Sequence, residues 1–229
     1  NGFQNKFNII IMKKIYFLFL KTSLIIHTYA YKFATIFSIK AFGVHPKHKI
    51  INYKDWFNSN ISKDDVVLDI GSKTGEMAYH MSKKCKKVFG IEIEKHSFSD
   101  AMNSYKNNNL KFLLGDATKF NYSDHIDGEI SVLTMSNVLE HIDDRVSFLQ
   151  DIIKQVNLKD NKVKILIRVP SIEREWVTPL KRDLGVEWRL DRTHFTEYTN
   201  EQLNNELESI NYVNSEIDTR FGEIYAVYL

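Results

Sequence analysis

Short apolar segments alternate with helical stretches from residue 60 onward, and this alternation constrains the fold most strongly. Five segments rich in Val, Ile, Leu and Phe are predicted strands: residues 65–70, 87–92, 110–115, 129–135 and 163–169. The apolar spacing between them predicts helices over residues 75–85, 95–107 and 137–157. Strands that alternate with helices imply right-handed crossovers and a parallel sheet covered on both faces.

The C-terminal part departs from this alternation. A helix capped near Thr199 or Asn200 is predicted to precede two strands, over residues 212–219 and 222–229, which a short turn joins. The parallel sheet is therefore expected to finish with an antiparallel pair.

Charge is distributed unevenly along the chain. The net charge is only +2, yet residues 1–60 hold nine lysines and a single acid. A segment with such an excess of positive charge typically meets an anionic surface. We therefore expect a basic, amphipathic helical arm over residues 1–59 and one domain over residues 60–229. The single cysteine, Cys85, excludes a disulfide framework and a cysteine-rich zinc site.

Residues 9–33 form a long apolar stretch within this arm. A lysine interrupts the stretch, which makes it a poor transmembrane span and a poor secretory signal. On a helix, four polar side chains would fall within about 40° of one another and form a narrow stripe on an otherwise apolar surface. These side chains are Lys14, Lys21, Thr28 and Lys32. Such a helix can lie at a membrane interface with its lysines toward anionic headgroups, or it can pack on the body or on a partner subunit.

Four segments resemble the motifs of a known family. They are "VVLDIGSKTG", "VFGIEIEK", "LLGDATKF" and "SNVLEHIDD", and their order and rough spacing are similar to those of class I S-adenosylmethionine-dependent methyltransferases. Each lies at the carboxyl end of a predicted strand, where ligands bind in open α/β sheets. The resemblance covers residues 60–229. It implies a Rossmann-like, seven-stranded sheet with helices on both faces, and S-adenosylmethionine as the cofactor.

The resemblance also implies which residues hold the cofactor. Asp69 would meet its methionine end, and Gly71 and Gly75 would let the backbone pass close to it. Glu92 would accept from both ribose hydroxyls, and Asp116 from the adenine amino group. The further cofactor residues implied are Ser72, Ile93, Ala117 and Asn137. The alternative is that the three acids are ordinary strand-end or capping residues.

Lys73 departs from the family pattern D-x-G-x-G-x-G, because it stands where the middle glycine is usual. A dinucleotide-binding domain is the nearest competing class, but its fingerprint G-x-G-x-x-G is missing. Lys73 could take a positive φ at a cost of roughly 1–2 kcal/mol. Alternatively, its backbone is ordinary and the side chain points to solvent, or the ammonium reaches the carboxylate of the cofactor. We favour the solvent-facing interpretation, with weaker cofactor affinity as its cost.

The segment after the fourth strand places Glu140 and His141 beside the expected methyl position. Methyl transfer from a sulfonium is an in-line displacement, so the protein aligns the acceptor and, for a hydroxyl, removes a proton. The form "VLEHI" resembles methyltransferases that act on hydroxyls of sugars, quinones and similar small molecules. His141 is therefore the first candidate base, although it could equally pack or cap within a helix. The eight histidines are scattered along the chain, so no metal site is predicted.

Residues 168–199 lie where an insertion usually covers the acceptor in this fold. This segment contains several aromatic residues, which could stack on a sugar ring, and five arginines, which could pair with phosphate or carboxylate. Alternatively, the aromatic residues could form the small core of a lid. The run "DRTHFTEYT" is similar to methyltransferases of bacterial polysaccharide and lipopolysaccharide assembly. His194 is a second candidate base or substrate ligand, with Asp191 orienting it.

We therefore predict a cytoplasmic S-adenosylmethionine-dependent methyltransferase that O-methylates a sugar or lipid-linked glycan in bacterial surface polysaccharide biosynthesis, with residues 9–33 at the inner face of the membrane. Nucleic acid is not expected as a partner, because residues 168–199 hold six basic and six acidic residues and no Asn/Asp-Pro-Pro-aromatic motif follows the fourth strand. Two alternatives remain: a non-catalytic protein of the same fold that docks on a membrane or partner, and a methyltransferase acting on another small molecule such as a quinone.

Overall fold

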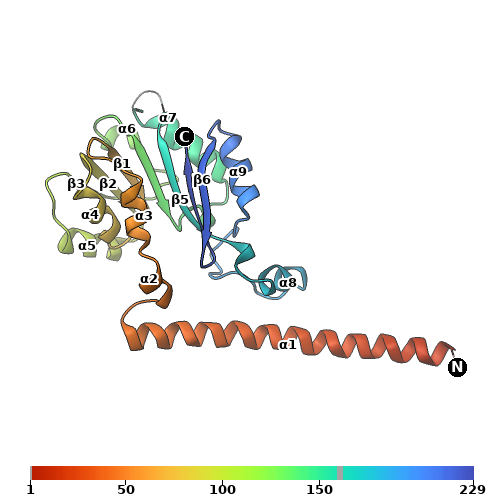
Figure 1. Ribbon diagram of the computed structural model, residues 1–229. Coiled ribbons are helices and arrows are strands. Elements are labelled where there is room, and N and C mark those ends of the chain that lie inside the picture. Colours follow the sequence, from red (N-terminus) through yellow and green to blue (C-terminus); the bar gives the residue numbers. More distant parts are fainter. Residues whose placement is uncertain (1, 159–161) are drawn as a thin grey trace. The chain divides into compact units, whose positions relative to one another are not determined.

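The computed structural model describes residues 2–158 and 162–229 (Figure 1). Residue 1 of the predicted arm and residues 159–161 of the predicted domain lie outside the described residues. The chain divides into two compact units. The sheet unit comprises residues 52–171 and 192–229, and the arm unit comprises residues 1–51 and 172–191.

The sheet unit contains one seven-stranded sheet in the order β3-β2-β1-β4-β5-β7-β6. Its strands are β1 (Val66–Ile70), β2 (Lys87–Glu92), β3 (Leu110–Leu114), β4 (Val132–Ser136), β5 (Lys164–Pro170), β6 (Asn214–Arg220) and β7 (Glu223–Tyr228). The first five strands run parallel, and β7 pairs antiparallel with both β5 and β6. The predicted fold class, a parallel sheet with a terminal antiparallel pair, is confirmed.

Helices cover both faces of this sheet. Figure 1 shows α3, α4 and α5 on one side and α6, α7 and α9 on the other. Their bounds are α3 (Tyr53–Ser59), α4 (Glu76–Ser82), α5 (Lys95–Ser104), α6 (Tyr122–His125), α7 (Arg145–Gln155) and α9 (Asn200–Glu208). Every residue of the interior strand β1 is buried, because a parallel strand between two helical layers has no solvent-facing side. The apolar core that results holds the carboxyl ends of β1 and β4 next to each other, with Asp69 opposite Thr134.

The predicted helix over residues 137–157 is wrong in its first half. Asn137 leaves β4 with a φ of 56°, a left-handed conformation, and its amide donates to the carbonyl of Arg168 at 2.8 Å. A single 3-10 turn, η1 (Leu139–His141), follows, and α7 begins only after Asp144, whose side chain accepts from the Ser147 amide at 3.1 Å. The predicted cap of the last helix is confirmed, since the Thr199 hydroxyl accepts from the Gln202 amide at 3.0 Å.

Residues 52–59, which were expected in the arm, pack with the sheet unit. Phe57 of α3 is fully buried, and the Trp56 ring lies edge-on to Tyr225 of β7, with 5.2 Å between the ring centroids. These two aromatic side chains anchor α3 on the sheet, which explains why the arm unit ends at Ile51.

The arm unit is built from helices. It contains α1 (Gly2–Phe42), α2 (Pro46–Ile50), the 3-10 turn η3 (Ile172–Arg174) and α8 (Val177–Asp183), and α1 contacts both α2 and α8. The first helix is longer than residues 9–33, because no glycine or proline interrupts it before Gly43, which has a φ of 74° and ends it.

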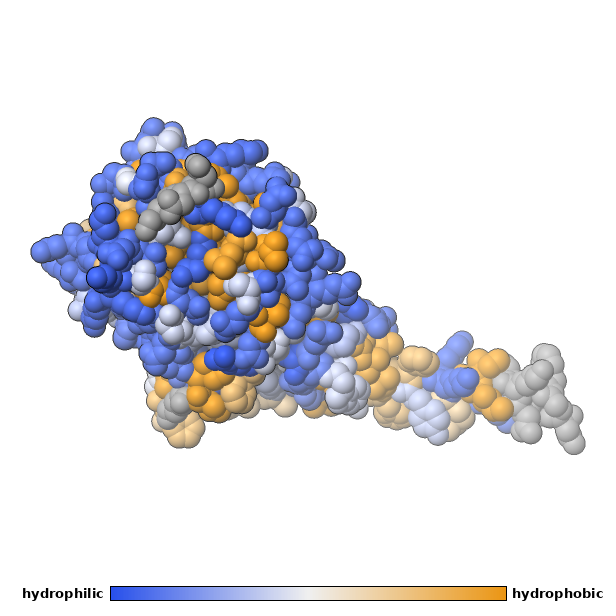
Figure 2. Space-filling view, turned by 45° about the horizontal axis from the view of Figure 1, so that its top comes forward, coloured by the Kyte–Doolittle hydropathy of each residue, from blue (hydrophilic) through white to orange (hydrophobic). Residues whose placement is uncertain are grey.

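Apolar side chains are exposed along most of α1 and are not confined to one face (Figure 2). Lys14, Lys21 and Lys32 of the predicted stripe are exposed as well, whereas Thr28 is partly buried and donates to the carbonyl of Leu24. The helix therefore has a narrow polar stripe but only a weak amphipathic character overall. Among the described residues, no helix combines the length and the apolarity needed to cross a membrane.

Candidate functional site

The turn after β1 is held in an unusual backbone conformation. Gly71, Lys73 and Gly75 have φ values of 70°, 50° and 82°. The amides of Gly71 and Ser72 both donate to the carbonyl of Ile91 in β2, each at 2.9 Å. The turn is therefore fixed to the end of the neighbouring strand rather than open to rearrangement.

Both glycines are also required by packing within the protein. A Cβ on Gly71 would lie 2.6 Å from Cγ2 of Val138, and one on Gly75 would lie 2.6 Å from Cζ of Phe112. These distances, together with the positive φ values, account for glycine at both positions without any ligand. The prediction that they let a cofactor approach stays a prediction.

Lys73 has an exposed side chain, as the favoured interpretation expected. That interpretation also predicted an ordinary backbone conformation for Lys73. This part of the prediction is wrong, because the φ of Lys73 is 50°. The residue thus occupies the left-handed conformation that a glycine would adopt at lower cost.

Asp69 is completely buried at the end of β1. Its Oδ1 accepts from the Thr134 hydroxyl at 2.7 Å, while its Oδ2 has no hydrogen-bond partner among the described residues. Burial, and in lesser part the charge of Glu92, raises the pKa of Asp69 from 3.8 to about 7. The Ser72 hydroxyl in the same turn is also buried without a partner. Two polar atoms left in this state are suited to a ligand that carries hydrogen-bonding groups and positive charge.

Glu92 ends β2 and links two turns. Its Oε2 accepts from the Lys73 amide at 2.8 Å, and its Oε1 accepts from the Glu94 amide at 2.7 Å. A carboxylate has about four acceptor sites, so each oxygen keeps one for the predicted ribose hydroxyls. The neighbouring Ile93 exposes 65% of its surface, an apolar side chain that a ligand could cover.

Asp116 and Ala117 form the turn after β3. Asp116 is about one-third exposed, and its Oδ1 accepts from the amide and the hydroxyl of Thr118 at 3.0 and 2.8 Å. Partial burial raises the pKa of Asp116, but these hydrogen bonds outweigh it and hold the pKa below its usual value. The Ala117 carbonyl accepts from Tyr122 at 2.7 Å, which fixes the turn. Asp116 is therefore ionised and accessible, as an acceptor for an amino group must be.

Glu140 is buried in η1, directly after β4. Its Oε2 is without a hydrogen-bond partner in the described part of the chain. Burial raises the pKa of Glu140 to about 8, so the carboxyl group is mostly protonated at neutral pH. Its backbone carbonyl accepts from the Phe195 amide at 2.7 Å, which brings the segment around residue 194 to η1.

His141 and His194, predicted separately from distant segments, lie against each other. Their rings make an edge-to-face contact with 4.7 Å between centroids. His141 is exposed and its Nδ1 lies 3.0 Å from the Thr193 hydroxyl. His194 is buried and its Nδ1 lies 3.1 Å from Oε1 of Glu197, a carboxylate that is itself buried.

Glu197 is a residue that the sequence analysis missed. It holds the His194 ring in the way predicted for Asp191. Asp191 belongs to the arm unit, and its role stays a prediction. The spacing of three residues between His194 and Glu197 was the available signal, but without knowledge of the turn it did not favour Glu197 over Asp191.

A buried ion pair at the carboxyl end of β5 also escaped the sequence analysis. The Arg168 guanidinium makes two hydrogen bonds to Glu223, at 2.7 and 2.8 Å, and a third to the Ser136 hydroxyl at 3.0 Å. It also lies 4.3 Å from the centroid of the Tyr53 ring. An arginine inside the apolar run of β5 was the signal, because a buried charge requires partners. This pair positions the ends of β4 and β5 beside η1.

Three ligand-type side chains meet at this place. Atoms of Glu140, His141 and His194 that could bind a metal lie within 4.8 Å of one another. The fold therefore brings together a possible metal-binding group, which the scattered positions of the histidines in the sequence did not indicate. The two histidines can also supply proton transfer, since an imidazole beside a carboxylate, as His194 is beside Glu197, is a competent base.

The strand order, the left-handed turn after β1 and the acids that end β1, β2 and β3 define the class of Rossmann-like S-adenosylmethionine-dependent methyltransferases. A family model described as a methyltransferase domain matches residues 47–217, and the chain belongs to this family. When bound, S-adenosylmethionine supplies an activated methyl group on a sulfonium. The unpartnered oxygens of Asp69 and Ser72 and the accessible carboxylate of Asp116 fit such a ligand.

The chain is similar in sequence and in fold to individual proteins. The chain is 31% identical to an uncharacterized protein of Methanocaldococcus jannaschii over 117 residues, which is 50% of this chain and 44% of that protein. It is 39% identical to an uncharacterized RNA methyltransferase of Oceanobacillus iheyensis over 82 residues, 34% of this chain and 18% of the relative. The chain thus spans less than half the length of these curated relatives. A complex of DhpI with SAM and HEP is similar in fold, with a TM-score of 0.61, 17% identity and coverage of 90% of this chain and 97% of the other.

Proposed function

We propose that this protein transfers the methyl group of S-adenosylmethionine to a hydroxyl group of a sugar or lipid-linked glycan. The observation that carries the proposal is the contact of buried His194 with Glu197. A carboxylate that accepts from Nδ1 of a histidine leaves Nε2 as the basic nitrogen and stabilises the imidazolium that forms. Removing a hydroxyl proton in the transition state is the task that such a pair performs.

The remaining residues have positioning roles in this proposal. Asp69 and Ser72 bind the methionine end of the cofactor, Glu92 the ribose and Asp116 the adenine. His141 packs on His194 and is the alternative base. Protonated Glu140 donates to an acceptor oxygen rather than competing with His194 for its proton.

The sugar acceptor is supported by an aromatic side chain that is available for stacking. Phe195, next to His194, exposes 61% of its surface. Exposed aromatic rings of this kind suit the apolar faces of sugar rings. We retain the proposal that residues 168–199 cover the acceptor, and that the exposed apolar surface and lysines of α1 hold the protein at an anionic membrane.

A second candidate function is methylation of RNA, because curated relatives include RNA methyltransferases. The two functions are separated by measuring the S-adenosylhomocysteine released from purified protein with matched panels of acceptors. The panels are free and nucleotide-linked sugars, extracted lipid-linked glycans, a quinol and structured RNA. We expect turnover with a glycan and none with RNA, and turnover with RNA alone would overturn the glycan proposal.

A further inference from the structure

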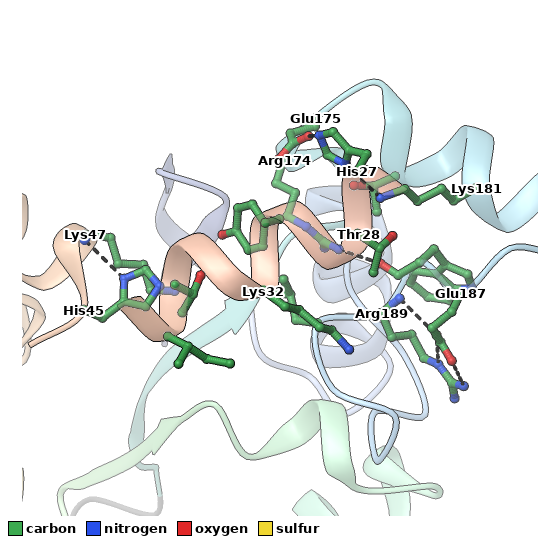
Figure 3. Close-up of a pocket in the computed structure, with 16 residues that line it drawn as sticks. His27, Thr28, Lys32, His45, Lys47, Arg174, Glu175, Lys181, Glu187 and Arg189 are labelled. Atoms are coloured by element: carbon green, nitrogen blue, oxygen red, sulfur yellow. Dashed lines mark hydrogen bonds and ion pairs between the residues drawn. The ribbon is translucent and has the colours of Figure 1, made fainter. Parts of the chain in front are cut away.

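A cavity of about 420 Å³ lies within the arm unit, between α1, the start of α2 and the segment after β5 (Figure 3). Its volume is in the range of about 300–1,000 Å³ that is usual for small-molecule sites. None of the residues assigned above to the cofactor or to proton transfer lines it. Cofactor binding and proton transfer as proposed above therefore leave this cavity without a role, although part of its lining belongs to residues 168–199.

Positive charge predominates in the lining of the cavity. Its lysine and arginine residues are Lys32, Lys47, Arg174, Lys181 and Arg189, against Glu175 and Glu187. Glu187 pairs with Arg189 at 2.9 Å, and Oε2 of Glu175 lies 3.7 Å from Nε2 of His27. Five lysine and arginine residues thus line the cavity together with two acids.

Lys181 is the most constrained of these cations. It is only 6% exposed, and its ammonium lies 3.1 Å from Nδ1 of His27. In the part of the chain that the structure describes, no carboxylate lies within ion-pair distance of it. Burial and the charge of Arg174 lower the pKa of Lys181, and the more distant charge of Glu175 only partly opposes them. A buried ammonium without a direct ion pair costs free energy, and a bound anion would offset that cost.

We infer that this cavity binds a phosphate-bearing ligand. The three terminal oxygens of a phosphate monoester can accept from donors on α1 and on the segment after β5 at once, and they offer more acceptor sites and more negative charge than a carboxylate. Tyr31, Ile36 and Trp188 line the rest of the cavity and can pack on the organic part of the ligand. This inference goes beyond the proposed function, because it concerns a separate site and holds whether the phosphate belongs to a sugar phosphate or to a lipid headgroup.

Calorimetric titration of the full chain with glucose 1-phosphate tests the inference, with glucose as the uncharged probe. We expect saturable binding of glucose 1-phosphate only. Lys181→Met, which removes a buried charge-assisted contact, should weaken the affinity for glucose 1-phosphate by about tenfold. Lys32→Gln, which removes an exposed contact, should weaken it by about threefold. Lys40→Gln is the matched control, since Lys40 is also exposed on α1 but does not line the cavity.

A second arm identifies the source of the phosphate. Sedimentation with phosphatidylcholine vesicles, with and without phosphatidic acid, should show binding that depends on Lys181 and on phosphatidic acid if the ligand is a lipid headgroup. Either kind of Lys181-dependent binding supports the inference. The inference is overturned if neither glucose 1-phosphate nor phosphatidic acid binds, or if Lys40→Gln and Lys32→Gln lose affinity equally.

Titration of the same samples with S-adenosylmethionine shows that each variant is folded. It also separates a failure at this cavity from a failure of the proposed enzyme. If Lys181→Met does not fold, the inference is tested by comparing the affinity of Lys32→Gln for glucose 1-phosphate with that of Lys40→Gln.

Discussion

The carboxylate of Glu92 accepts a hydrogen bond of 2.8 Å from the backbone amide of Lys73, the residue whose φ of 50° departs from the ordinary range. The second oxygen of Glu92 binds the Glu94 amide at 2.7 Å. Glu92 therefore holds the turns after β1 and β2 together before any ligand arrives. The acid that the sequence predicted as a ribose ligand is also the residue that maintains a strained turn.

Replacing Lys73 by glycine should stabilise the protein. Relief of the left-handed conformation gains roughly 1–2 kcal/mol, and the greater freedom of glycine in the unfolded chain costs roughly 0.5–1 kcal/mol. We expect a net gain of about 0.5–1 kcal/mol in the free energy of unfolding, measured by urea denaturation. Thr74→Gly is the control, because the φ of Thr74 is not positive, and it should destabilise. A loss of stability in Lys73→Gly would show that the turn is not strained.

Glu92→Gln should weaken both the turn and cofactor binding. An amide nitrogen cannot accept, so one of the two backbone amides loses its partner at a cost of about 1–3 kcal/mol in unfolding free energy. We expect affinity for S-adenosylmethionine to fall by about tenfold or more, measured by calorimetry. Glu129→Gln, on an exposed residue, should change neither quantity. Unchanged affinity in Glu92→Gln would remove Glu92 from the cofactor site.

The sheet could be predicted from the sequence because each parallel strand is a short apolar run buried on both faces. Candidate cofactor residues could be proposed because strand ends in such a sheet meet at one edge. The backbone of Lys73 could not be predicted, since its conformation depends on the hydrogen bond from its amide to an acid 19 residues away. The helix predicted over residues 137–157 failed for a similar reason: the left-handed Asn137 is fixed by the carbonyl of Arg168 on the next strand.

Stability should depend on pH through Asp69. Its pKa is raised from 3.8 to about 7, so between these values the folded state binds more protons than the unfolded state, and stability falls as pH rises. Asp69→Asn keeps an oxygen for Thr134 and removes this titration. We expect the loss of unfolding free energy from pH 5 to pH 8 to be smaller in Asp69→Asn than in the native protein, by about 2–3 kcal/mol.

Denaturation at both pH values provides the measurement. Glu140, with a pKa of about 8, contributes a loss of the same sign in both proteins and cancels in the comparison. Asp64→Asn, on an exposed residue, is the control and should follow the native protein. Equal losses in Asp69→Asn and the native protein would mean that Asp69 titrates normally.

Glu197→Gln should slow catalysis without affecting cofactor binding. The substitution removes the charge beside His194 that stabilises the imidazolium, so kcat should fall by about 10- to 100-fold. The KM for S-adenosylmethionine should not change, and the low-pH limb of the kcat profile should move. Glu201→Gln, on the exposed side of α9, serves as the control. A normal pH profile with a normal kcat would assign the role of base to His141 instead. In that case His141→Asn should abolish activity.

Activity should not require a metal ion. In the proposed mechanism a histidine removes the hydroxyl proton, a task that a divalent ion would otherwise assist by acidifying the hydroxyl. We expect the turnover rate to be unchanged after dialysis against a chelator. Loss of activity that Mn²⁺ or Zn²⁺ restores would show that Glu140, His141 and His194 act together as a metal site.

The proximity of these three side chains illustrates the limit of sequence reasoning at this site. His141 and His194 are 53 residues apart, and the contact between them depends on the bond from the Phe195 amide to the Glu140 carbonyl. A motif can identify each histidine, but only the folded chain shows that Glu197, rather than a charge elsewhere, lies at 3.1 Å from His194.

Cofactor binding at the end of β1 and β2 is measured by calorimetric titration of the full chain with S-adenosylmethionine. We expect saturable binding with one site per chain, weakened at least about tenfold in Asp69→Ala and in Glu92→Ala. No saturable binding, or equal affinity in the native protein and both variants, would contradict the assignment of this fold and this site to methyl transfer.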